Sequence, residues 1–175
     1  ARNEATLSLD LSGLQDLTLK FWMKEFSDED HGPPTTPFTN GADFDGVAIS
    51  ADGVNWYEVQ GLRSSNGIST TYQEFTVDLS AAATSRGLSI GPAFKIRFNH
   101  YDDNPLTSDG FAFDDIHLTA RHMEQLTLNV PASITEGGGG NAVVTLPAAR
   151  ALDTVVHLSS NRPGQLSLPA TVTIP

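Results

Sequence analysis

Apolar and polar residues alternate along most of the first 120 positions, and clusters of Gly, Pro, Asn and Asp interrupt the alternation. Leu7, Leu9 and Leu11 share one face of such a segment, and residues 17–23 repeat the pattern. A period of two residues marks a strand with one buried face, and many short strands separated by turns are typical of a β-sandwich or barrel. The pattern therefore predicts an all-β fold built from antiparallel strands.

The alternation and its breaks also place the individual elements. Strands are predicted over residues 6–11, 17–23, 46–50, 56–59, 72–77, 94–99 and 111–120. The short link 12–16 predicts that the first two strands are neighbours, and the segment 50–56 (SADGVNW) predicts a hairpin that turns at Asp52 and Gly53. One short helix is predicted over residues 80–86, where Ser80 serves as N-cap and Gly87 ends the helix.

The character of the chain changes around residues 121–125, because Phe, Tyr and Trp are absent beyond Phe113. Short strands are predicted after this point over residues 126–130, 142–146, 154–159, 166–168 and 171–174. About 50 residues of short strands enclose little core and leave strand edges unpaired. We therefore expect a β-sandwich domain over residues 1–122 and only part of a second β-domain over residues 126–175.

Composition and charge narrow the range of partners. Hydrophobic residues make up 39% of the chain, which suffices for an ordinary core, and the net charge of −11 opposes binding to nucleic acid or to an anionic membrane. The chain has no cysteine, which excludes disulfides and thiolate sites. No apolar run approaches the ~18–20 residues of a membrane span, so we expect no membrane insertion.

Four segments of the first domain carry a resemblance to a known family. They are 26–31 (FSDEDH), 43–57 (DFDGVAISADGVNWY), 77–79 (VDL) and 109–116 (DGFAFDDI). Together they resemble a bacterial surface module related to the MAM and reelin-type jelly rolls. The resemblance implies a jelly-roll-like sandwich over residues 1–120, lacking one or two strands at its N-terminal side, in a secreted or cell-surface protein.

The second segment resembles the first half of a Calx-beta-like domain, an immunoglobulin-like sandwich. The resemblance rests on residues 130–137 (VPASITEG) and 168–175 (LPATVTIP). It implies a repeat unit of a large secreted or surface-attached protein, in which such domains act as spacers and often bind Ca²⁺. Glu136 matches the acidic position after the first strand of that pattern.

Acidic residues are concentrated in three loops of the first domain. Calcium binds six to eight oxygen atoms, so several acidic loops that converge on one point can form its site. The loops contain Asp28, Glu29 and Asp30, then Asp43 and Asp45, then Asp102, Asp103 and Asp109, followed by Asp114 and Asp115. We expect a Ca²⁺ site whose ligands are Asp28, Asp30, Asp43, Asp45 and Asp114.

Asp114 is the key residue of this hypothesis. It shares parity with Ile116 and Leu118, so it faces the core if they do, and a buried carboxylate needs a cation or hydrogen-bond donors. In jelly rolls with a structural calcium, which the chain resembles, an Asp-x-Ile aspartate of the last strand binds the metal together with an early acidic residue such as Glu4. The alternative is that these acids are solvated turn residues.

Two other functions remain open from the sequence. Exposed aromatic residues next to polar ones can bind sugars, and Tyr57, His100 and Tyr101 are the candidates for such a site. Residues 87–91 (GLSIG) match the Gly-x-Ser-x-Gly pattern of hydrolases around Ser89, but that motif requires a helix after the serine, whereas here the predicted helix precedes it. We therefore expect no catalytic residues.

The sequence thus predicts a calcium-stabilised binding, adhesion or connecting module of a larger extracellular protein. The main alternative is a carbohydrate-binding module of a secreted polysaccharide-active enzyme, and a serine hydrolase using Ser89 is the third. Glycans or another surface protein are the expected partners, and unpaired strand edges favour a homodimer.

Overall fold

The computed structural model describes residues 1–104, 109–123, 125–147 and 153–175. The chain divides into two compact units, Ala1–Met123 and Glu124–Pro175, and the division lies within the region where the composition changes. Among the described residues, no helix is both long enough and apolar enough to cross a membrane.

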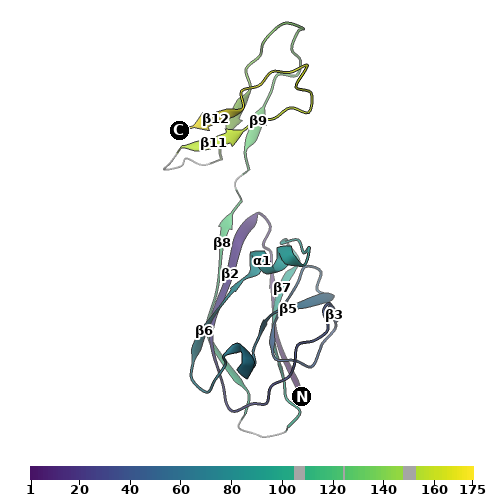
Figure 1. Ribbon diagram of the computed structural model, residues 1–175, viewed down its shortest axis with the longest axis vertical. Coiled ribbons are helices and arrows are strands. Elements are labelled where there is room, and N and C mark those ends of the chain that lie inside the picture. The colour runs from purple at the N-terminus through teal and green to yellow at the C-terminus, as the bar shows by residue number, and fades with distance from the viewer. Residues whose placement is uncertain (105–108, 124, 148–152) are drawn as a thin grey trace. The chain divides into compact units, whose positions relative to one another are not determined.

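Unit 1 is a sandwich of two antiparallel sheets, which form facing layers in Figure 1. One sheet has five strands in the order β1 (Arg2–Leu9), β7 (Phe94–Tyr101), β4 (Gly46–Ser50), β5 (Asn55–Gly61) and β3 (Phe38–Thr39). The other has three strands in the order β6 (Gln73–Asp78), β2 (Leu14–Glu25) and β8 (Phe111–His122). The predicted all-β sandwich is confirmed.

The core between the sheets follows from the alternation along β2. Leu17, Leu19, Phe21 and Met23 are buried, and Phe21 lies at the centre of a group of aromatic rings. Its ring centroid is 5.5 Å from that of Phe75, 5.2 Å from that of Phe98 and 6.0 Å from that of Phe113. These rings come from both sheets, so Phe21 joins the two layers.

The first two strands are not neighbours, contrary to the prediction. β1 pairs with β7 along its whole length, whereas β2 lies between β6 and β8 in the opposite sheet. The link crosses from one layer to the other, with Leu11 buried and Gly13 at a φ of 71°. Alternation shows which face of a strand is buried but not which strand it pairs with.

Two short helices connect strands in unit 1. The helix α1 (Leu79–Ser85) begins one residue before the predicted start, and Asp78 is its N-cap because its carboxylate accepts a hydrogen bond from the Ala81 N–H at 2.8 Å. The Ser80 hydroxyl instead accepts from the Leu17 N–H at 2.8 Å, which attaches the helix to β2. The second is a single 3₁₀ turn, η1 (Ser64–Asn66).

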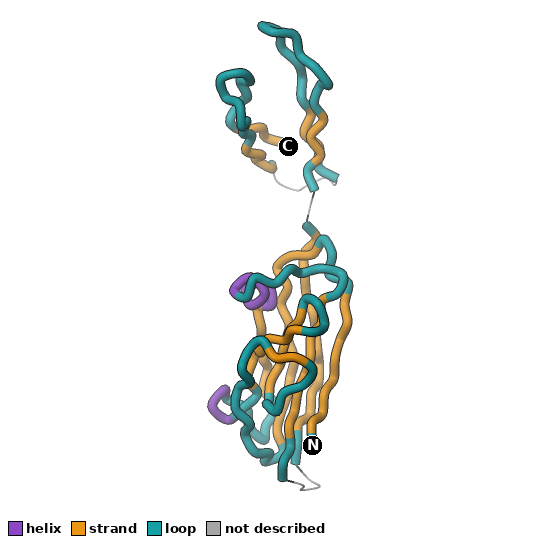
Figure 2. Tube along the Cα trace, turned by 90° about the vertical axis from the view of Figure 1, so that its right-hand side faces the viewer, coloured by secondary structure: helices purple, strands orange, loops and turns teal. Residues whose placement is uncertain are grey.

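The outer face of the five-stranded sheet is covered by the segment 26–45. Phe38 and Phe44 from this segment pack with Ala48 and Trp56 in a second apolar cluster, so every residue of β4 is buried. The Arg97 guanidinium lies 3.8 Å from the Trp56 ring centroid and so packs against this cluster. Figure 2 shows loop segments in teal over one side of the strands of unit 1.

Strand β8 contains a bulge that reverses its inward and outward faces. Asp115 and Ile116 together lie opposite Phe21 of β2, and Asp115 has a φ of 47°. Phe113 before the bulge and Leu118 after it both pack against the core, although they differ in parity. Asp114 and Ile116 are exposed as a result, and the prediction that Asp114 faces the core is wrong.

Unit 2 consists of two antiparallel hairpin-like pairs. Strand β9 (Thr127–Asn129) pairs with β10 (Val143–Thr145), and β11 (Thr154–His157) pairs with β12 (Thr171–Ile174). The predicted strand 166–168 is not a strand in the structure. Among the described residues of this unit the buried apolar side chain is Val156, while several apolar side chains are exposed, including Leu128, Val130, Val143 and Val155.

Two adjacent residues of β2 test the assignment of its faces. We expect Phe21→Ala to lower the free energy of unfolding by about 3–5 kcal/mol, because it leaves a cavity among the aromatic rings. Its neighbour Trp22 faces outward and is 39% exposed, so we expect Trp22→Ala to cost about 1 kcal/mol or less. Urea denaturation followed by circular dichroism measures both. Equal losses would contradict the assignment.

Candidate metal centre

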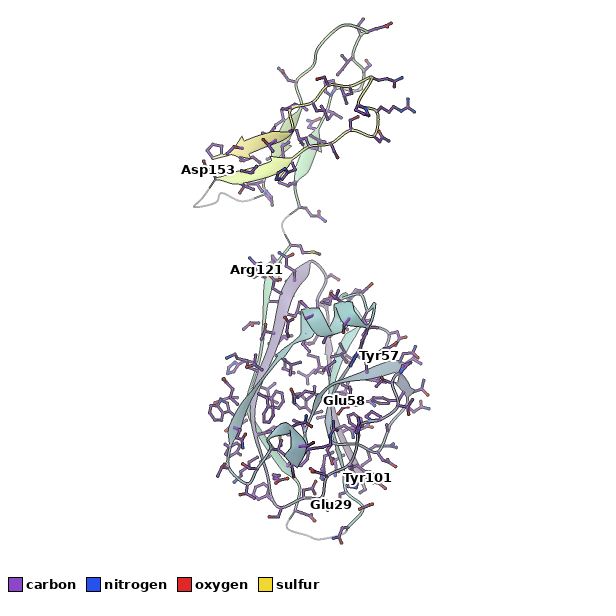
Figure 3. All side chains as sticks on the ribbon, viewed as in Figure 1. Glu29, Tyr57, Glu58, Tyr101, Arg121 and Asp153 are labelled. Atoms are coloured by element: carbon purple, nitrogen blue, oxygen red, sulfur yellow. The ribbon has the colours of Figure 1, made fainter. Side chains whose placement is uncertain are left out.

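Acidic and histidine side chains from three segments meet at one end of unit 1. Three overlapping groups each have possible ligand atoms within 4.8 Å of one another. The groups are Asp28, Asp45 and His100; Asp28, Glu29 and Asp109; and Glu29, His31 and Asp103. Figure 3 shows Glu29 and Tyr101 at this end of the unit.

The backbone places Asp28 next to Asp109. After β2 ends, the Phe26 N–H donates a hydrogen bond of 2.8 Å to the Gly110 carbonyl, and Ser27 turns the chain with a φ of 55°. Gly110 has a φ of 114°, which side-chain-bearing residues rarely adopt, so a glycine is favoured directly after Asp109. This backbone contact between β2 and β8 therefore positions Asp28 and Asp109 close to each other.

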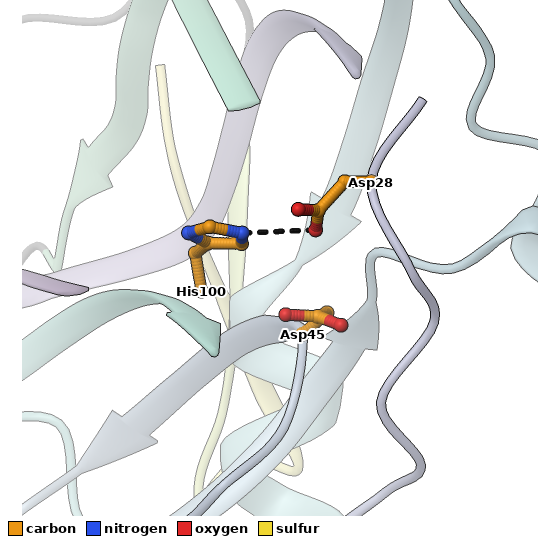
Figure 4. A group of neighbouring side chains, drawn as sticks. All are labelled: Asp28, Asp45 and His100. Carbon is orange, nitrogen blue, oxygen red and sulfur yellow. Dashed lines mark hydrogen bonds and ion pairs between the residues drawn. The ribbon is translucent and has the colours of Figure 1, made fainter. Parts of the chain in front are cut away.

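The carboxylate of Asp28 is completely buried and only half satisfied. Its side chain has no exposed area, and its Oδ2 lies 2.8 Å from His100 Nε2, a contact drawn in Figure 4. Its Oδ1 is buried without a hydrogen-bond partner among the described residues. Burial raises the pKa of Asp28 to about 6, although the neighbouring His100 acts in the opposite direction. A buried acceptor without a partner needs an explanation, such as a bound cation.

Asp45 is also buried, but its carboxylate is fully used by the protein. Its Oδ1 accepts from the Tyr101 N–H at 2.9 Å, and its Oδ2 accepts from the His31 N–H at 2.7 Å and lies 3.1 Å from His31 Nδ1. Burial raises its pKa, and the two backbone hydrogen bonds partly oppose that shift. Asp45 therefore joins the segment before β4 to His31 and to the end of β7.

Glu29 binds the segment that follows β7. Its Oε1 accepts hydrogen bonds from the Asp103 N–H at 3.2 Å and from the Asn104 N–H at 3.0 Å. Hydrogen bonds from its own N–H and from these two N–H groups hold its pKa below the ordinary value. Glu29 therefore carries its negative charge beside the buried Asp28.

Buried carboxylate oxygens without a hydrogen-bond partner are concentrated at this end of the sandwich. In the described part of the chain, they are Oε2 of Glu25, Oδ1 of Asp28, Oδ1 of Asp102 and Oδ2 of Asp109. All four belong to residues near the end of β2 or to those between β7 and β8. Burial, with a contribution from Asp30, also raises the pKa of Glu25. These buried acceptor oxygens lack a hydrogen-bond donor or a cation as a partner among the described residues.

The three groups differ in the metal that they suit. Asp28, Glu29 and Asp109 offer only carboxylate oxygens, which are the ligands that Ca²⁺ prefers. The group with Asp45 and His100 contains an imidazole nitrogen, but its members already bind each other or the backbone. The all-oxygen group therefore fits a calcium ion best, while His100 orients Asp28.

Of the five predicted ligands, the structure brings Asp28 and Asp45 together. Asp30 accepts from the Ser64 N–H at 2.8 Å and attaches its loop to η1. Asp43 is exposed near Arg2, with 3.5 Å between Oδ1 and Nη1, and Asp114 is exposed on β8. Glu29 and Asp109 belong to the same acidic loops but are not among the predicted ligands, whereas Asp114 is predicted as a ligand because it shares parity with Ile116 and Leu118.

The predicted sugar-binding residues are occupied by protein contacts. Tyr57 is half-buried on β5, with the Arg86 guanidinium 5.8 Å from its ring centroid. Tyr101 packs edge-on against His31, and the His100 ring lies 4.6 Å from that of Phe111. Figure 3 shows Tyr57 and Tyr101 apart from each other, so these residues do not form one platform.

Ser89 is exposed in the link between α1 and β7. The helix α1 precedes this serine and β7 follows it, which is the reverse of the strand and helix order that the hydrolase motif requires.

No family model, curated protein or solved structure matches this chain. The relationship of unit 1 to MAM and reelin-type jelly rolls, and of unit 2 to Calx-beta-like domains, stays a prediction.

The raised pKa values predict how the metal-free protein responds to pH. Folding raises the pKa of Asp28 from 3.8 to about 6. Burial lowers the pKa of His31, but the carboxylates of Asp45 and Asp103 outweigh it and raise that pKa above 6.5. The folded protein thus binds these protons more tightly than the unfolded chain does. The stability that proton binding contributes is lost as pH rises through these folded pKa values. In EDTA, we expect a lower melting temperature at pH 8 than at pH 5.

Asp28→Asn provides the control for this pH dependence. The amide does not titrate, so we expect the variant to lose a smaller part of its stability between pH 5 and pH 8 than the parent does. Thermal melts in EDTA at intervals of half a pH unit measure the difference. A melting temperature of the parent that rises over this range would show that the carboxyl is not destabilised by burial.

Proposed function

We propose that unit 1 is a calcium-stabilised β-sandwich that serves as a binding, adhesion or connecting module of a larger extracellular protein. The observation that carries the proposal is the pair of buried carboxylate oxygens, Oδ1 of Asp28 and Oδ2 of Asp109, that have no hydrogen-bond partner among the described residues. With Glu29, these residues place three carboxylates within ligand distance of one ion.

Electrostatics favours a divalent cation at this position. Three carboxylates whose oxygens lie within 4.8 Å repel one another, and water does not screen the buried oxygens of Asp28 and Asp109. A proton can neutralise one of them at a time, whereas one Ca²⁺ interacts with all three. Calcium accepts flexible loop ligands and adds backbone carbonyls and water, while Mg²⁺ requires a more regular octahedral set.

A calcium ion at this site would join two segments of the chain at one end of the sandwich. Asp28 and Glu29 follow β2 of the three-stranded sheet, and Asp109 precedes β8 of the same sheet. His100, which contacts Asp28, belongs to β7 of the five-stranded sheet. The ion would therefore hold the segment after β2 to the segment before β8, where a chain without cysteine has no disulfide to do so, and the contact between Asp28 and His100 would attach them to β7.

A calcium site of this kind suits the extracellular setting that we propose. Extracellular calcium modules bind the ion with dissociation constants as weak as about 10⁻⁴–10⁻³ M, because calcium is abundant there. A module whose folded form binds calcium stays compact in that setting and gains rigidity. This is the property that a connecting or adhesive unit of a surface protein needs.

Calcium removal tests the proposal directly. At calcium concentrations about 100 times the dissociation constant, binding adds about 2.7 kcal/mol to stability, which corresponds to a rise of about 10 °C in the melting temperature of unit 1. We expect that rise between EDTA and excess Ca²⁺, and we expect Asp28→Asn and Asp109→Asn to remove most of it. Differential scanning calorimetry of the full chain measures the shift.

Asp43→Asn is the matched control, because Asp43 is an exposed loop carboxylate outside all three groups. We expect this variant to keep the full calcium-dependent shift. The proposal is wrong if the parent melts at the same temperature in EDTA and in calcium. It is also wrong if Asp43→Asn removes as much of the shift as Asp28→Asn.

A further inference from the structure

The two sheets of unit 1 differ in what covers their outer faces. On the five-stranded sheet, the segment 26–45 buries Trp56, which is 1% exposed. On the three-stranded sheet, the described residues of unit 1 leave the outer face open, and Trp22 on its central strand is 39% exposed. Figure 1 shows β2 between β6 and β8 in this sheet.

Strand register places polar groups on both sides of Trp22. Its cross-strand partner is Glu74 on β6 and Asp114 on β8, and both are exposed. Lys20, two residues away on the same face, has its Nζ 3.4 Å from Glu74 Oε2. The Trp22 ring is therefore flanked by two carboxylates and has an ammonium group close to one of them.

Two further aromatic rings extend this face toward the end of β2. Phe26 and Tyr72 are each 44% exposed. The Lys24 Nζ lies 4.5 Å from the Phe26 ring centroid and 5.1 Å from the Tyr72 ring centroid, so both rings interact with the same ammonium group. We name Trp22, Phe26, Tyr72 and their charged neighbours Lys20, Lys24, Glu74 and Asp114 the aromatic face.

The bulge in β8 completes the aromatic face. With regular alternation, Asp114 would share the inward face of Leu118. Because two residues of β8 lie opposite Phe21, Asp114 instead points outward beside Trp22. Bulges commonly redirect side chains at functional positions. The bulge thus turns the Asp114 carboxylate away from the core and places it next to the exposed indole of Trp22.

We propose that the aromatic face binds a carbohydrate chain. A pyranose ring has a face of C–H groups that packs on an indole, while its hydroxyl groups project sideways as donors and acceptors. Glu74 and Asp114 accept hydrogen bonds from such hydroxyls on both sides of Trp22, and Lys20 and Lys24 donate to them. Phe26 and Tyr72 offer packing surfaces for further residues of the chain.

The chemistry of the aromatic face fits a glycan better than other polymers. The centre of a protein interface is depleted of charged residues, whereas here Glu74 and Asp114 lie across from Trp22 and the Lys24 ammonium group lies against the other two rings. The net charge of −11 opposes nucleic acid binding. This proposal is independent of the calcium site, since none of its residues belongs to the acidic groups of the metal centre.

Tryptophan fluorescence and gel retardation test the proposal on the full chain in excess calcium. The probes are soluble xylan, galactomannan, mixed-linkage β-glucan and alginate. The chain has two tryptophans, and Trp56 is buried, so a change in emission on binding reports on Trp22. We expect at least one probe to retard the protein in a native gel and to protect its emission from acrylamide quenching.

Variants then assign the binding to this face. We expect Trp22→Ala to weaken binding at least about 10-fold, and Asp114→Asn or Glu74→Gln to weaken it less. Tyr57→Ala, an aromatic variant on the opposite sheet, is the control and should bind as the parent does. A cooperative melt within about 5 °C of that of the parent would show that Trp22→Ala is folded. The proposal is wrong if no probe retards the protein, or if Trp22→Ala binds with the affinity of the parent.

Discussion

The carboxylate of Asp45 organises the acidic end of unit 1. It is buried, and it accepts hydrogen bonds from the backbone of His31 and of Tyr101, which are distant from it in sequence. Removing such a group leaves buried donors unpaired, which costs more than the hydrogen bonds contribute. Because Asp45 holds these segments together, Asp28 and His100 lie close enough to interact (Figure 4). The proposed metal centre therefore depends on a residue whose own oxygens already accept hydrogen bonds.

The calcium site and the glycan-binding face that we propose for unit 1 are separated because the outer faces of its two sheets differ in what covers them. The segment 26–45 both covers the five-stranded sheet and supplies Asp28, Glu29 and Asp45. Packing of Phe38 and Phe44 under this segment anchors it, so the acidic residues do not depend on a free loop. The three-stranded sheet has no such cover among the described residues, and its aromatic side chains remain accessible.

The bulge in β8 shows why parity arguments fail at particular positions. A period of two correctly assigns the faces of β2, where Phe21 is buried and Trp22 is exposed. In β8 the bulge at Asp115, which has a positive φ, adds one residue to the strand. Asp114 and Leu118 therefore face opposite sides although their parity is the same. The sequence contains no clear local signal for this insertion, because the bulge forms opposite a specific residue of a strand distant along the chain.

The sequence by itself determined the fold class, most strand positions, the break in composition near residue 123 and the loops in which the acidic residues lie. These depend on alternation, turn residues and composition, which are local properties. Only the tertiary structure decided that β1 and β2 belong to different sheets, that Asp28, Glu29 and Asp109 meet, and that Asp114 lies beside Trp22. Those outcomes depend on pairing between strands that are far apart along the chain, and pairing is determined by how the whole core packs.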